Sequence, residues 1–203
     1  MIRLDRDGLV WTLTLDRPDK ANALTRDMLV QIRDIAAEAE QADLAAFVLT
    51  GAGHVFSAGA DIEAARAGLA TDGLWEEASS RIARLPCLTI AALNGTLAGG
   101  AFGVALACDV RMAVPEAKFF YPVMALGFLP QPSDPKRLAA LIGPARAKMI
   151  LLAAQKIDSE TALAWGLVDR VVAPKQLMAE ARALTVAPVA AAGPMRCAIK
   201  RMV

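Results

Sequence analysis

The stretch PCLTIAALNGTLAGGAFGVALAC occupies residues 86–108 and contains no Asp, Glu, Lys, Arg or His. Gly95, Gly99 and Gly103 repeat within it at intervals of four residues. Two structures are typical of such a pattern. One is a membrane-spanning helix that pairs through G-x-x-x-G. The other is a buried strand, turn and helix whose backbone approaches a ligand closely.

The residues in and around this stretch favour the second structure. LTIAAL (88–93) has strand character and is followed by Asn94-Gly95, which is a strong turn signal. The small residues from 100 to 108 predict a helix. Alanine and glycine contribute little to membrane transfer, and Asp109 and Arg111 follow at once. We therefore expect a buried strand, a turn and a helix N-terminus, and no association with a membrane.

The composition narrows the functional classes. A chain of 203 residues is expected to form one domain. A net charge of +1 gives no basic surface for nucleic acid. The first residues, MIRLDRDGLVW, carry dispersed charges and predict no secretory signal. Cys87, Cys108 and Cys197 lack C-x-x-C spacing, which indicates buried free thiols in a reducing cytoplasm.

The single histidine, His54, excludes several kinds of catalytic site. A His-rich zinc site is impossible, and a Ser-His-Asp triad has only this imidazole to use. No G-x-S-x-G motif supplies the serine. His54 lies in GAGHVF, a Gly-rich turn, and we interpret it as a loop residue. The sequence predicts no metal site.

Apolar periodicity in the first two thirds of the chain predicts alternating strands and helices. Thr25 is expected to cap a helix whose apolar positions keep a 3.6-residue period. Residues 62–84 carry helical patterns interrupted at Gly68 and Gly73. The remaining strands are predicted at residues 9–16, 45–51 and 109–114.

The last third of the chain is predicted to be mainly helical. Gly143-Pro144 opens a helix to about residue 154, with proline at a favoured first-turn position. Ser159 is expected to cap a short helix that ends at Trp165-Gly166, and residues 167–172 are extended. We predict an α/β fold in one domain, 1–203, with a core over about 1–142 and a helical part over about 143–203.

Two glycine-bearing turns are the strongest candidates for chemistry: FSAGADI (56–62) and NGTLAGGAFGVALACD (94–109). Each follows an apolar strand and precedes a helical pattern. Backbone N–H groups at such turns are accessible to a ligand, and two that converge on one carbonyl oxygen form an oxyanion hole. The same glycines are equally expected in tight turns within a packed core.

Several segments in order resemble the crotonase superfamily, which includes the enoyl-CoA hydratases and isomerases. The resemblance implies a spiral of ββα turns, here with a shortened C-terminal helical region because the chain stops at PMRCAIKRMV. It implies an acyl-CoA substrate, assembly as homotrimers or hexamers, and no cofactor beyond the coenzyme A moiety. The matching segments are RPDKANALT (17–25), GAGHVFSAGADI (51–62), IAALNGTLAGGAFGVALACDVRMA (90–113), FFYPVMALGFLP (119–130) and ALAWGLVDRVV (162–172).

The resemblance also implies roles for individual residues. The backbone N–H groups of Ala60, in AGAD, and Gly100, in AGGA, would hold the thioester oxygen. The contacts with coenzyme A would fall on Lys20, Ala21, Ala23, Ala58, Asp61 and Ile62. Lys20 is equally expected as a solvated surface lysine.

The chain departs from the family where hydratases carry two glutamates. By motif match these positions are Gly103 and Val123, and neither side chain moves a proton. Ordinary hydratase activity is therefore not expected. Gln131 is a candidate for orienting water. Asp134 is interpreted as the N-cap of a helix in SDPKRL, with Pro135 at the first helical position, and Tyr121 either faces the acyl group or packs in the core.

These observations leave three functions open. The leading one is an acyl-CoA-processing enzyme of the cytoplasm that stabilises a thioester enolate or oxyanion through Ala60 and Gly100. Within it, decarboxylation of an acyl-CoA or hydrolysis of the thioester needs no strong protein base. The alternative from another class is a non-catalytic CoA-binding or assembly subunit. Asp109 is expected to be structural, and Glu63 to be exposed.

Overall fold

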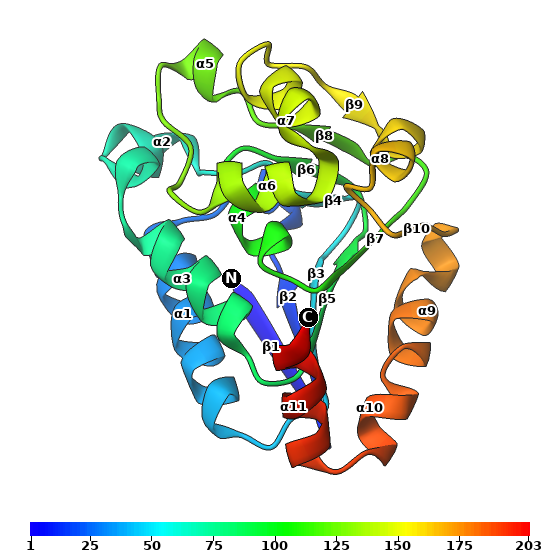
Figure 1. Cartoon of the computed structure of the whole chain (residues 1–203). Coiled ribbons are helices and arrows are strands. Elements are labelled where there is room, and N and C mark those ends of the chain that lie inside the picture. The colour runs from blue at the N-terminus through cyan, green and yellow to red at the C-terminus, as the bar shows by residue number, and fades with distance from the viewer.

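The computed structural model describes all 203 residues, and they form two β-sheets surrounded by helices (Figure 1). The larger sheet has six strands in the order β1-β2-β3-β5-β7-β10, and the smaller has four in the order β4-β6-β8-β9. The strands of the larger sheet are β1 (Ile2–Asp7), β2 (Val10–Leu15), β3 (Ala46–Gly51), β5 (Leu88–Leu93), β7 (Val110–Ala113) and β10 (Arg170–Val171).

The centre of the larger sheet consists of the apolar strands that the sequence predicts. β2, β3, β5 and β7 are parallel neighbours, and β3 and β5 are buried over almost their whole length. Continuous apolar runs are typical of parallel strands that are covered on both faces. The strands predicted at 9–16, 45–51, 88–93 and 109–114 are confirmed.

The edge strand β1 is a strand that the sequence reading missed. It pairs antiparallel with β2, and Gly8, with φ of +57°, forms the turn between them. Apolar and charged residues alternate in its first four residues, IRLD, because only one face is covered, and the last three residues of the strand are all charged and exposed. The sequence reading used these charges only as an argument against a secretory signal, although charged residues are also typical of exposed edge strands.

The smaller sheet completes the spiral that the family resemblance implies. A strand of the larger sheet, a strand of the smaller sheet and a helix follow one another three times, as β3-β4-α2, β5-β6-α4 and β7-β8-α5. Strands of two or three residues are too short for a periodic pattern, so the sequence did not reveal them. The strands are β4 (Val55–Ser57), β6 (Thr96–Ala98), β8 (Lys118–Phe120) and β9 (Ile157–Asp158).

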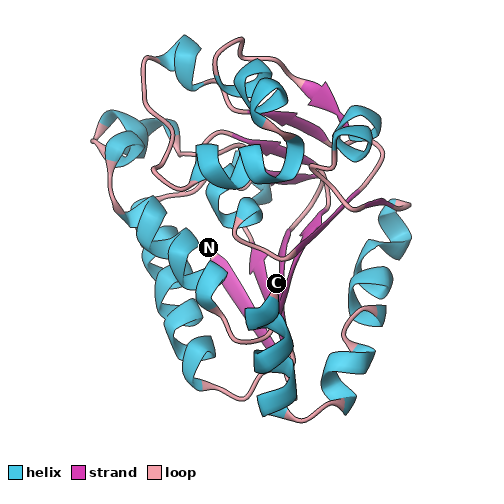
Figure 2. Ribbon diagram, in the orientation of Figure 1, coloured by secondary structure: helices cyan, strands magenta, loops and turns pink.

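Helices enclose both sheets (Figure 2). In Figure 1, α1 and α3 lie on one side of the larger sheet and α9 on the other. Thr25 caps α1 as predicted, because its side chain accepts a hydrogen bond from the Met28 N–H. The helices of the core are α1 (Arg26–Gln41), α2 (Ile62–Arg66), α3 (Leu74–Arg84), α4 (Ala101–Leu106), α5 (Val123–Leu126) and α6 (Asp134–Ile142).

The C-terminal part is mainly helical. Three short 3-10 helices occur in the chain, one of them in this part. In α8 the N-cap is Asp158, whose side chain accepts from the Thr161 N–H at 2.9 Å. The prediction that Ser159 is the cap is wrong by one residue, because its hydroxyl donates to the Pro115 carbonyl instead. The elements are α7 (Pro144–Leu151), α8 (Ser159–Trp165), α9 (Leu177–Ala183), α10 (Val186–Ala190), α11 (Gly193–Met202), η1 (Pro18–Lys20), η2 (Leu69–Thr71) and η3 (Pro174–Gln176).

The uncharged stretch 86–108 forms β5, a turn, β6 and α4. Every residue of α4 is buried, which explains the absence of charge. Gly95 and Gly99 lie in turns and only Gly103 lies in a helix, so the glycines form no helix-pairing stripe. None of the helices is both long enough and apolar enough to cross a membrane.

The cysteines and two acids lie close to expectation. Cys87 and Cys108 are buried free thiols, as predicted. Cys197 is only half-buried, so the prediction of burial is wrong for this residue. Asp109 accepts hydrogen bonds from the Thr89 N–H and the Lys200 ammonium, both at 2.8 Å. It therefore ties α11 to the start of β5. Glu63 is exposed, as predicted.

Candidate active site

Two glycine turns meet at the ends of β4 and β6. Gly59 has φ of +93° and Gly99 has φ of +56°, a left-handed conformation that L side chains rarely adopt. A Cβ atom on Gly59 would lie 2.9 Å from the Ala98 carbonyl oxygen, and one on Gly99 would lie 3.5 Å from the Gly59 Cα. The two turns approach this closely because both residues are glycine.

Each of these glycines precedes one of the predicted oxyanion-hole residues. The N–H groups of Ala60 and Gly100 donate to no oxygen within the protein, whereas the Gly59 N–H donates to the Ser57 hydroxyl and the Gly99 N–H to the Phe120 carbonyl. Ala60 and Gly100 both line a cavity of about 300 Å³. The structure therefore brings two unpaired backbone donors to one cavity.

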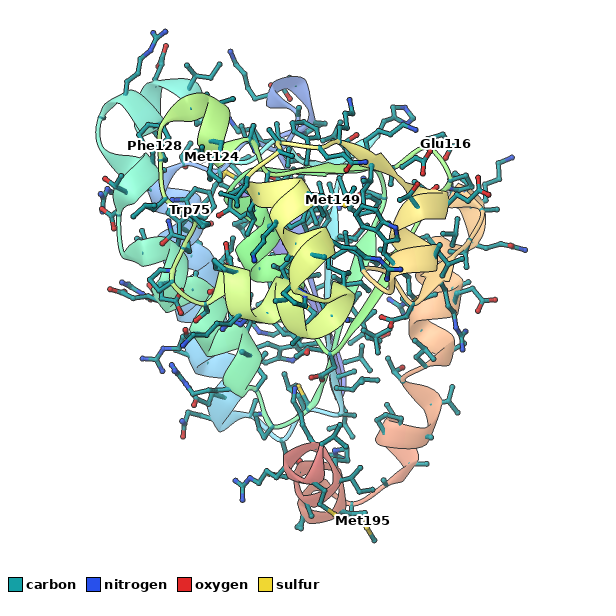
Figure 3. All side chains as sticks on the ribbon, turned by 45° about the horizontal axis from the view of Figure 1, so that its top comes forward. Trp75, Glu116, Met124, Phe128, Met149 and Met195 are labelled. Atoms are coloured by element: carbon teal, nitrogen blue, oxygen red, sulfur yellow. The ribbon has the colours of Figure 1, made fainter.

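The cavity walls are mainly apolar and come from α2, α3, α5 and the segment after α5. The Trp75 ring covers Gly100, since a Cβ at Gly100 would lie 3.1 Å from it, and its indole N–H donates to the Leu69 carbonyl at 2.8 Å. Trp75 and Phe128 lie on the same side of the molecule (Figure 3). The lining residues are Ala58, Ala60, Ile62, Ala65, Arg66, Ala70, Trp75, Ala98, Gly99, Gly100, Phe120, Tyr121, Pro122, Val123, Leu126, Phe128, Leu129 and Gln131.

Sequence reasoning did not assign Trp75 or Phe128 to the site. Both lie outside the glycine motifs, and neither has a local pattern that distinguishes a cavity wall from a packed core. No other feature of the sequence singled them out. An aromatic wall against an N–H donor excludes water and strengthens hydrogen bonds to a developing charge.

The predicted CoA loop, residues 17–24, is fixed by Asn22. This buried amide donates to the carbonyls of Ala52 and Val55 at 2.8 and 2.7 Å, and its oxygen accepts from the Arg17 N–H. Ala21 and Asn22 both have a left-handed backbone, with φ of 48° and 51°. Since neither residue is glycine, the hydrogen bonds of Asn22 offset the strain.

The six predicted CoA contacts fall into two groups. Ala58 and Ile62 line the cavity, whereas Lys20, Ala21, Ala23 and Asp61 lie outside its walls. Lys20 is exposed at the end of η1. These roles stay predictions.

Asp61 connects the CoA loop to α2. Its carboxylate accepts from Arg17 at 2.7 Å and caps α2 through the N–H groups of Glu63 and Ala64. The hydrogen bond from Arg17 is the main reason that the pKa of Asp61 lies below its usual value, with the N–H of Ala64 next. Sequence reasoning did not single out Arg17, which joins the loop to the glycine turn at residues 56–62.

Neither of the two positions at which the resemblance predicts a glutamate in hydratases carries a polar side chain here. Val123 is 8% exposed and lines the cavity, and Gly103 is buried within α4. Gln131, also 8% exposed, lines the same cavity. Gln131 therefore lines the same cavity as Ala60 and Gly100.

The interpretation of Asp134 as a helix N-cap is wrong. Ser133 is the N-cap residue of α6, and Asp134 is the first helical residue with its side chain turned into the protein. Asp134 is 1% exposed and its Oδ2 accepts a hydrogen bond from the Tyr121 hydroxyl at 2.8 Å. Its other oxygen, Oδ1, has no hydrogen-bond partner. The local S-D-P signature did not reveal this buried contact.

Burial controls the ionisation of this pair. It raises the pKa of Asp134 to about 7, although the Tyr121 hydrogen bond and the charge of Arg137 act in the opposite direction. Burial, together with the neighbouring Asp134, also raises the pKa of Tyr121 well above its usual value. Asp134 therefore gains and loses its proton near neutral pH.

Glu76 is the second carboxylate near Asp134. It accepts hydrogen bonds from the N–H and hydroxyl of Ser133 and from the Ser80 hydroxyl. Burial opposes its ionisation, but these bonds and Arg137 lower its pKa overall. Glu76 thus stays ionised near neutral pH, and its charge helps to keep the pKa of Asp134 high.

The remaining titratable residues form no further site. His54 is exposed in a turn between β3 and β4, as predicted. Nowhere in the chain do three or more His, Cys, Asp or Glu side chains converge in a way that suits a metal ion.

The sequence of this chain is similar to the sequences of known proteins over most of its length. Residues 5–199 match the family model described as "Enoyl-CoA hydratase/isomerase". The chain is 36% identical over 186 residues to the short-chain-enoyl-CoA hydratase of Clostridium acetobutylicum, covering 88% of this chain and 71% of that protein. It is 35% identical over 189 residues to the carnitinyl-CoA dehydratase of Citrobacter koseri, covering 90% of this chain and 72% of that protein.

Solved structures show the same fold. The structure of DspI from Pseudomonas aeruginosa has a TM-score of 0.90 at 32% identity, over 98% of this chain and 78% of that one. An enoyl-CoA hydratase from Bacillus anthracis has a TM-score of 0.91 at 29% identity, over 98% and 81%. With two sheets wound in ββα turns and a sequence match over nearly its whole length, this chain belongs to the enoyl-CoA hydratase/isomerase family.

Proposed function

We propose that this protein is an acyl-CoA-processing enzyme that binds the thioester oxygen between the N–H groups of Ala60 and Gly100. One observation carries the proposal: two backbone donors without partners face one apolar cavity, and each follows a left-handed glycine. Relatives named for reactions of enoyl-CoA and carnitinyl-CoA support a CoA thioester as the ligand.

The two donors suit a reaction in which negative charge develops on the thioester oxygen. Fixed N–H groups in a water-poor cavity stabilise an enolate or a tetrahedral oxyanion more than the ground-state carbonyl, and each such donor contributes about 10²–10³-fold in rate. A cavity of about 300 Å³ suits a short acyl group. The CoA portion of the ligand would extend from the cavity past Ala58 and Ile62 towards the 17–24 loop, where the exposed Lys20 ammonium could bind a phosphate.

Hydration of a double bond is not the reaction that we propose. It requires a group that activates water and one that protonates the α-carbon, and Gly103 and Val123 supply neither. Decarboxylation of an acyl-CoA needs chiefly enolate stabilisation. Hydrolysis of the thioester needs an oriented water, for which the amide of Gln131 in the cavity wall is the available group.

The proposal includes no cofactor beyond the CoA moiety of the substrate. We place the activity in the cytoplasm, where its three free cysteines stay reduced. We also propose self-association as a trimer or hexamer. Exposed apolar side chains near the cavity support this proposal: Met124, Leu126, Phe128 and Leu129.

The oxyanion contact is tested by replacing Gly100 with proline. The φ of Gly100 is −59°, which proline adopts, and its N–H has no partner to lose within the protein. We expect wild-type protein to bind butyryl-CoA about 30-fold more tightly than S-butyl-CoA, a thioether without the carbonyl oxygen, because each of the two hydrogen bonds contributes about 1 kcal/mol. Gly100→Pro removes one of the two donors and should lower this preference to about 5-fold, as measured by calorimetry.

Gly100→Ala is the matched control for this variant. It introduces the same Cβ against Trp75 but keeps the N–H, so any loss common to both variants reports packing alone. A proline variant that keeps the full thioester preference would show that the Gly100 donor does not hold the thioester oxygen. Failure of the wild-type protein to bind either compound would contradict the acyl-CoA site as a whole.

Hydratase activity is tested directly with crotonyl-CoA. We expect hydration to be at least about 10²-fold slower than in ordinary hydratases of the family, because Gly103 and Val123 stand where those enzymes are expected to carry their two glutamates. Loss of absorbance of the enoyl thioester measures the rate. Hydration at the usual rate would contradict the role that we assign to Gly103 and Val123.

Binding and turnover measurements with CoA esters distinguish an enzyme from the alternative, a non-catalytic CoA-binding subunit. A protein that binds several CoA esters tightly, but converts none of them and exchanges none of their α-protons, is a CoA-binding subunit. Turnover or exchange of any one ester supports the enzyme.

A further inference from the structure

Tyr121 is the one ionisable side chain in the cavity wall that is joined to a buried acid. It lies directly after β8, lines the cavity and is 3% exposed. Its ring stacks on Phe102 of α4, with centroids 5.3 Å apart and planes 22° apart. The stacked ring fixes the position of the hydroxyl, which donates to Asp134 Oδ2 at 2.8 Å.

Asp134 occupies the space that a side chain at position 103 would fill. A Cβ atom on Gly103 would lie 3.0 Å from Asp134 Oδ1 and 3.4 Å from Oδ2. Glycine at 103 is therefore the residue that allows this carboxyl group to lie against α4. A carboxyl group is present beside the position of the absent glutamate, but it comes from a different helix.

The surroundings of Asp134 are unusual for an acid with a structural role alone. It is 1% exposed and Oδ1 has no partner, so ionisation leaves a buried negative charge with one hydrogen bond. Burial raises its pKa to about 7, and the facing charged groups are Arg137 on its own helix and Glu76 on α3. Buried acids with raised pKa values beside a ligand cavity are typical of groups that transfer protons.

We propose that Tyr121 and Asp134 form the proton-transfer pair of this site, with the Tyr121 hydroxyl exchanging a proton with the α-carbon of a bound acyl-CoA. This inference rests on the acyl-CoA site proposed above. Tyr121 is the catalytic residue, because it lines the cavity. Asp134 acts through Tyr121 as the acceptor of its proton and as the residue that orients its hydroxyl.

The proposed step balances without a further reactant. The α-carbon–hydrogen bond breaks and its proton passes to the Tyr121 oxygen, while the phenolic proton passes to Asp134 Oδ2. The electron pair of the broken bond moves into the thioester and forms an enolate, whose oxygen lies between the N–H groups of Ala60 and Gly100. The reverse transfer returns a proton, and an enolate formed by decarboxylation accepts one in the same way.

The exchange of α-protons tests the pair independently of the overall reaction. The full chain is incubated with butyryl-CoA in D₂O, and deuterium at the α-carbon is measured by mass spectrometry. We expect exchange by the wild-type protein, and a decrease of at least about 10²-fold in Tyr121→Phe and Asp134→Asn. Affinity for butyryl-CoA, measured by calorimetry, should change by less than about 3-fold, since neither variant alters the backbone donors.

The dependence on pH separates proton transfer from a purely structural role. Exchange by the wild-type protein should increase about 10-fold per pH unit below about pH 7 and level off above it, because the pair accepts a proton only when Asp134 is ionised. The residual exchange of Asp134→Asn should lack this increase. Asp27→Asn, which changes an exposed carboxylate on α1, is the control and should keep the wild-type rate and profile.

Each outcome decides between the two proposals. Wild-type protein that binds butyryl-CoA without α-proton exchange overturns the proton-transfer pair and leaves the binding site intact. Wild-type protein that does not bind the thioester overturns the site itself. Exchange at the wild-type rate in Tyr121→Phe also overturns the pair. If Asp134→Asn fails to fold, Tyr121→Phe carries the test by itself, because phenylalanine keeps the ring that stacks on Phe102.

Discussion

Gly103→Glu is expected to lower the free energy of unfolding by about 4 kcal/mol, which in a chain of this size lowers the melting temperature by about 12 °C. The new Cβ meets Asp134 Oδ1 at 3.0 Å, which is closer than most Cβ contacts allow. The rest of the side chain has no space, because every residue of α4 is buried. A second carboxylate beside Asp134 adds like-charge repulsion at low dielectric.

This substitution places a glutamate where the family resemblance predicts one, and it should nevertheless damage the protein. Crotonyl-CoA hydration should increase less than about 10-fold, because Val123 still supplies no second acid or base. Adding Asp134→Ala should restore part of the stability, with a coupling energy of about 2 kcal/mol, since the introduced carboxylate can then accept the Tyr121 hydrogen bond. Urea unfolding of the two single variants and the double variant measures this coupling.

Gly73→Glu is the matched control for Gly103→Glu. A Cβ at Gly73 meets no atom within 4 Å, and this exposed residue caps α3, where a negative charge is favourable. It should change the free energy of unfolding by less than about 0.5 kcal/mol. Additive losses in the double variant of Gly103 and Asp134 would contradict the contact between these two residues.

The sequence predicts the larger sheet well because the central strands can be identified from their own residues. Continuous apolar runs such as β3 and β5 indicate strands covered on both faces, and each ends at a glycine turn that the chain needs for its reversal. The charged edge strand β1 and the strands of the smaller sheet escape the same reasoning. They are too exposed or too short for apolar periodicity to distinguish them from loops.

The candidate site also has one part that the sequence indicates and another that only the tertiary structure reveals. Ala60 and Gly100 follow glycines in strand-turn-helix segments, and the family resemblance of these segments selects them as candidates. The contact between Asp134 and Gly103 joins α6 to α4 and exists only in the tertiary structure. The local sequence SDPKRL indicated a capping residue, and packing around Tyr121 overrode that preference. An acid that the local pattern assigns to the surface is instead 1% exposed and hydrogen-bonded to Tyr121 of the cavity wall.

Asp134→Asn is expected to stabilise the protein more as the pH increases. The pKa of Asp134 is raised from 3.8 to about 7 in the folded protein. An acid with a raised pKa destabilises the folded state once the unfolded chain ionises. The penalty is therefore absent below about pH 4, grows up to about pH 7 and then stays near about 4 kcal/mol, at 1.36 kcal/mol per pKa unit.

The difference in unfolding free energy between Asp134→Asn and the wild-type protein should increase by about 3 kcal/mol from pH 5 to pH 8. Asparagine keeps an acceptor for the Tyr121 hydroxyl, and the cost of its unpaired amide N–H₂ is the same at every pH. The carboxylates with lowered pKa values, at Asp61, Asp72, Glu76 and Asp158, are ionised throughout this range in both proteins, so their contributions cancel.

Urea unfolding of both proteins at pH 5, 6, 7 and 8 measures this difference, and Asp27→Asn should show none. A difference that stays constant with pH would contradict the buried ionisation of Asp134. Because the same substitution is expected to abolish α-proton exchange, an increase in stability together with a loss of exchange excludes misfolding as the cause. Replacing a residue with a purely structural role would lower the stability of the protein. Replacing a buried acid that serves proton transfer should instead raise it, because the ionised acid destabilises the folded state.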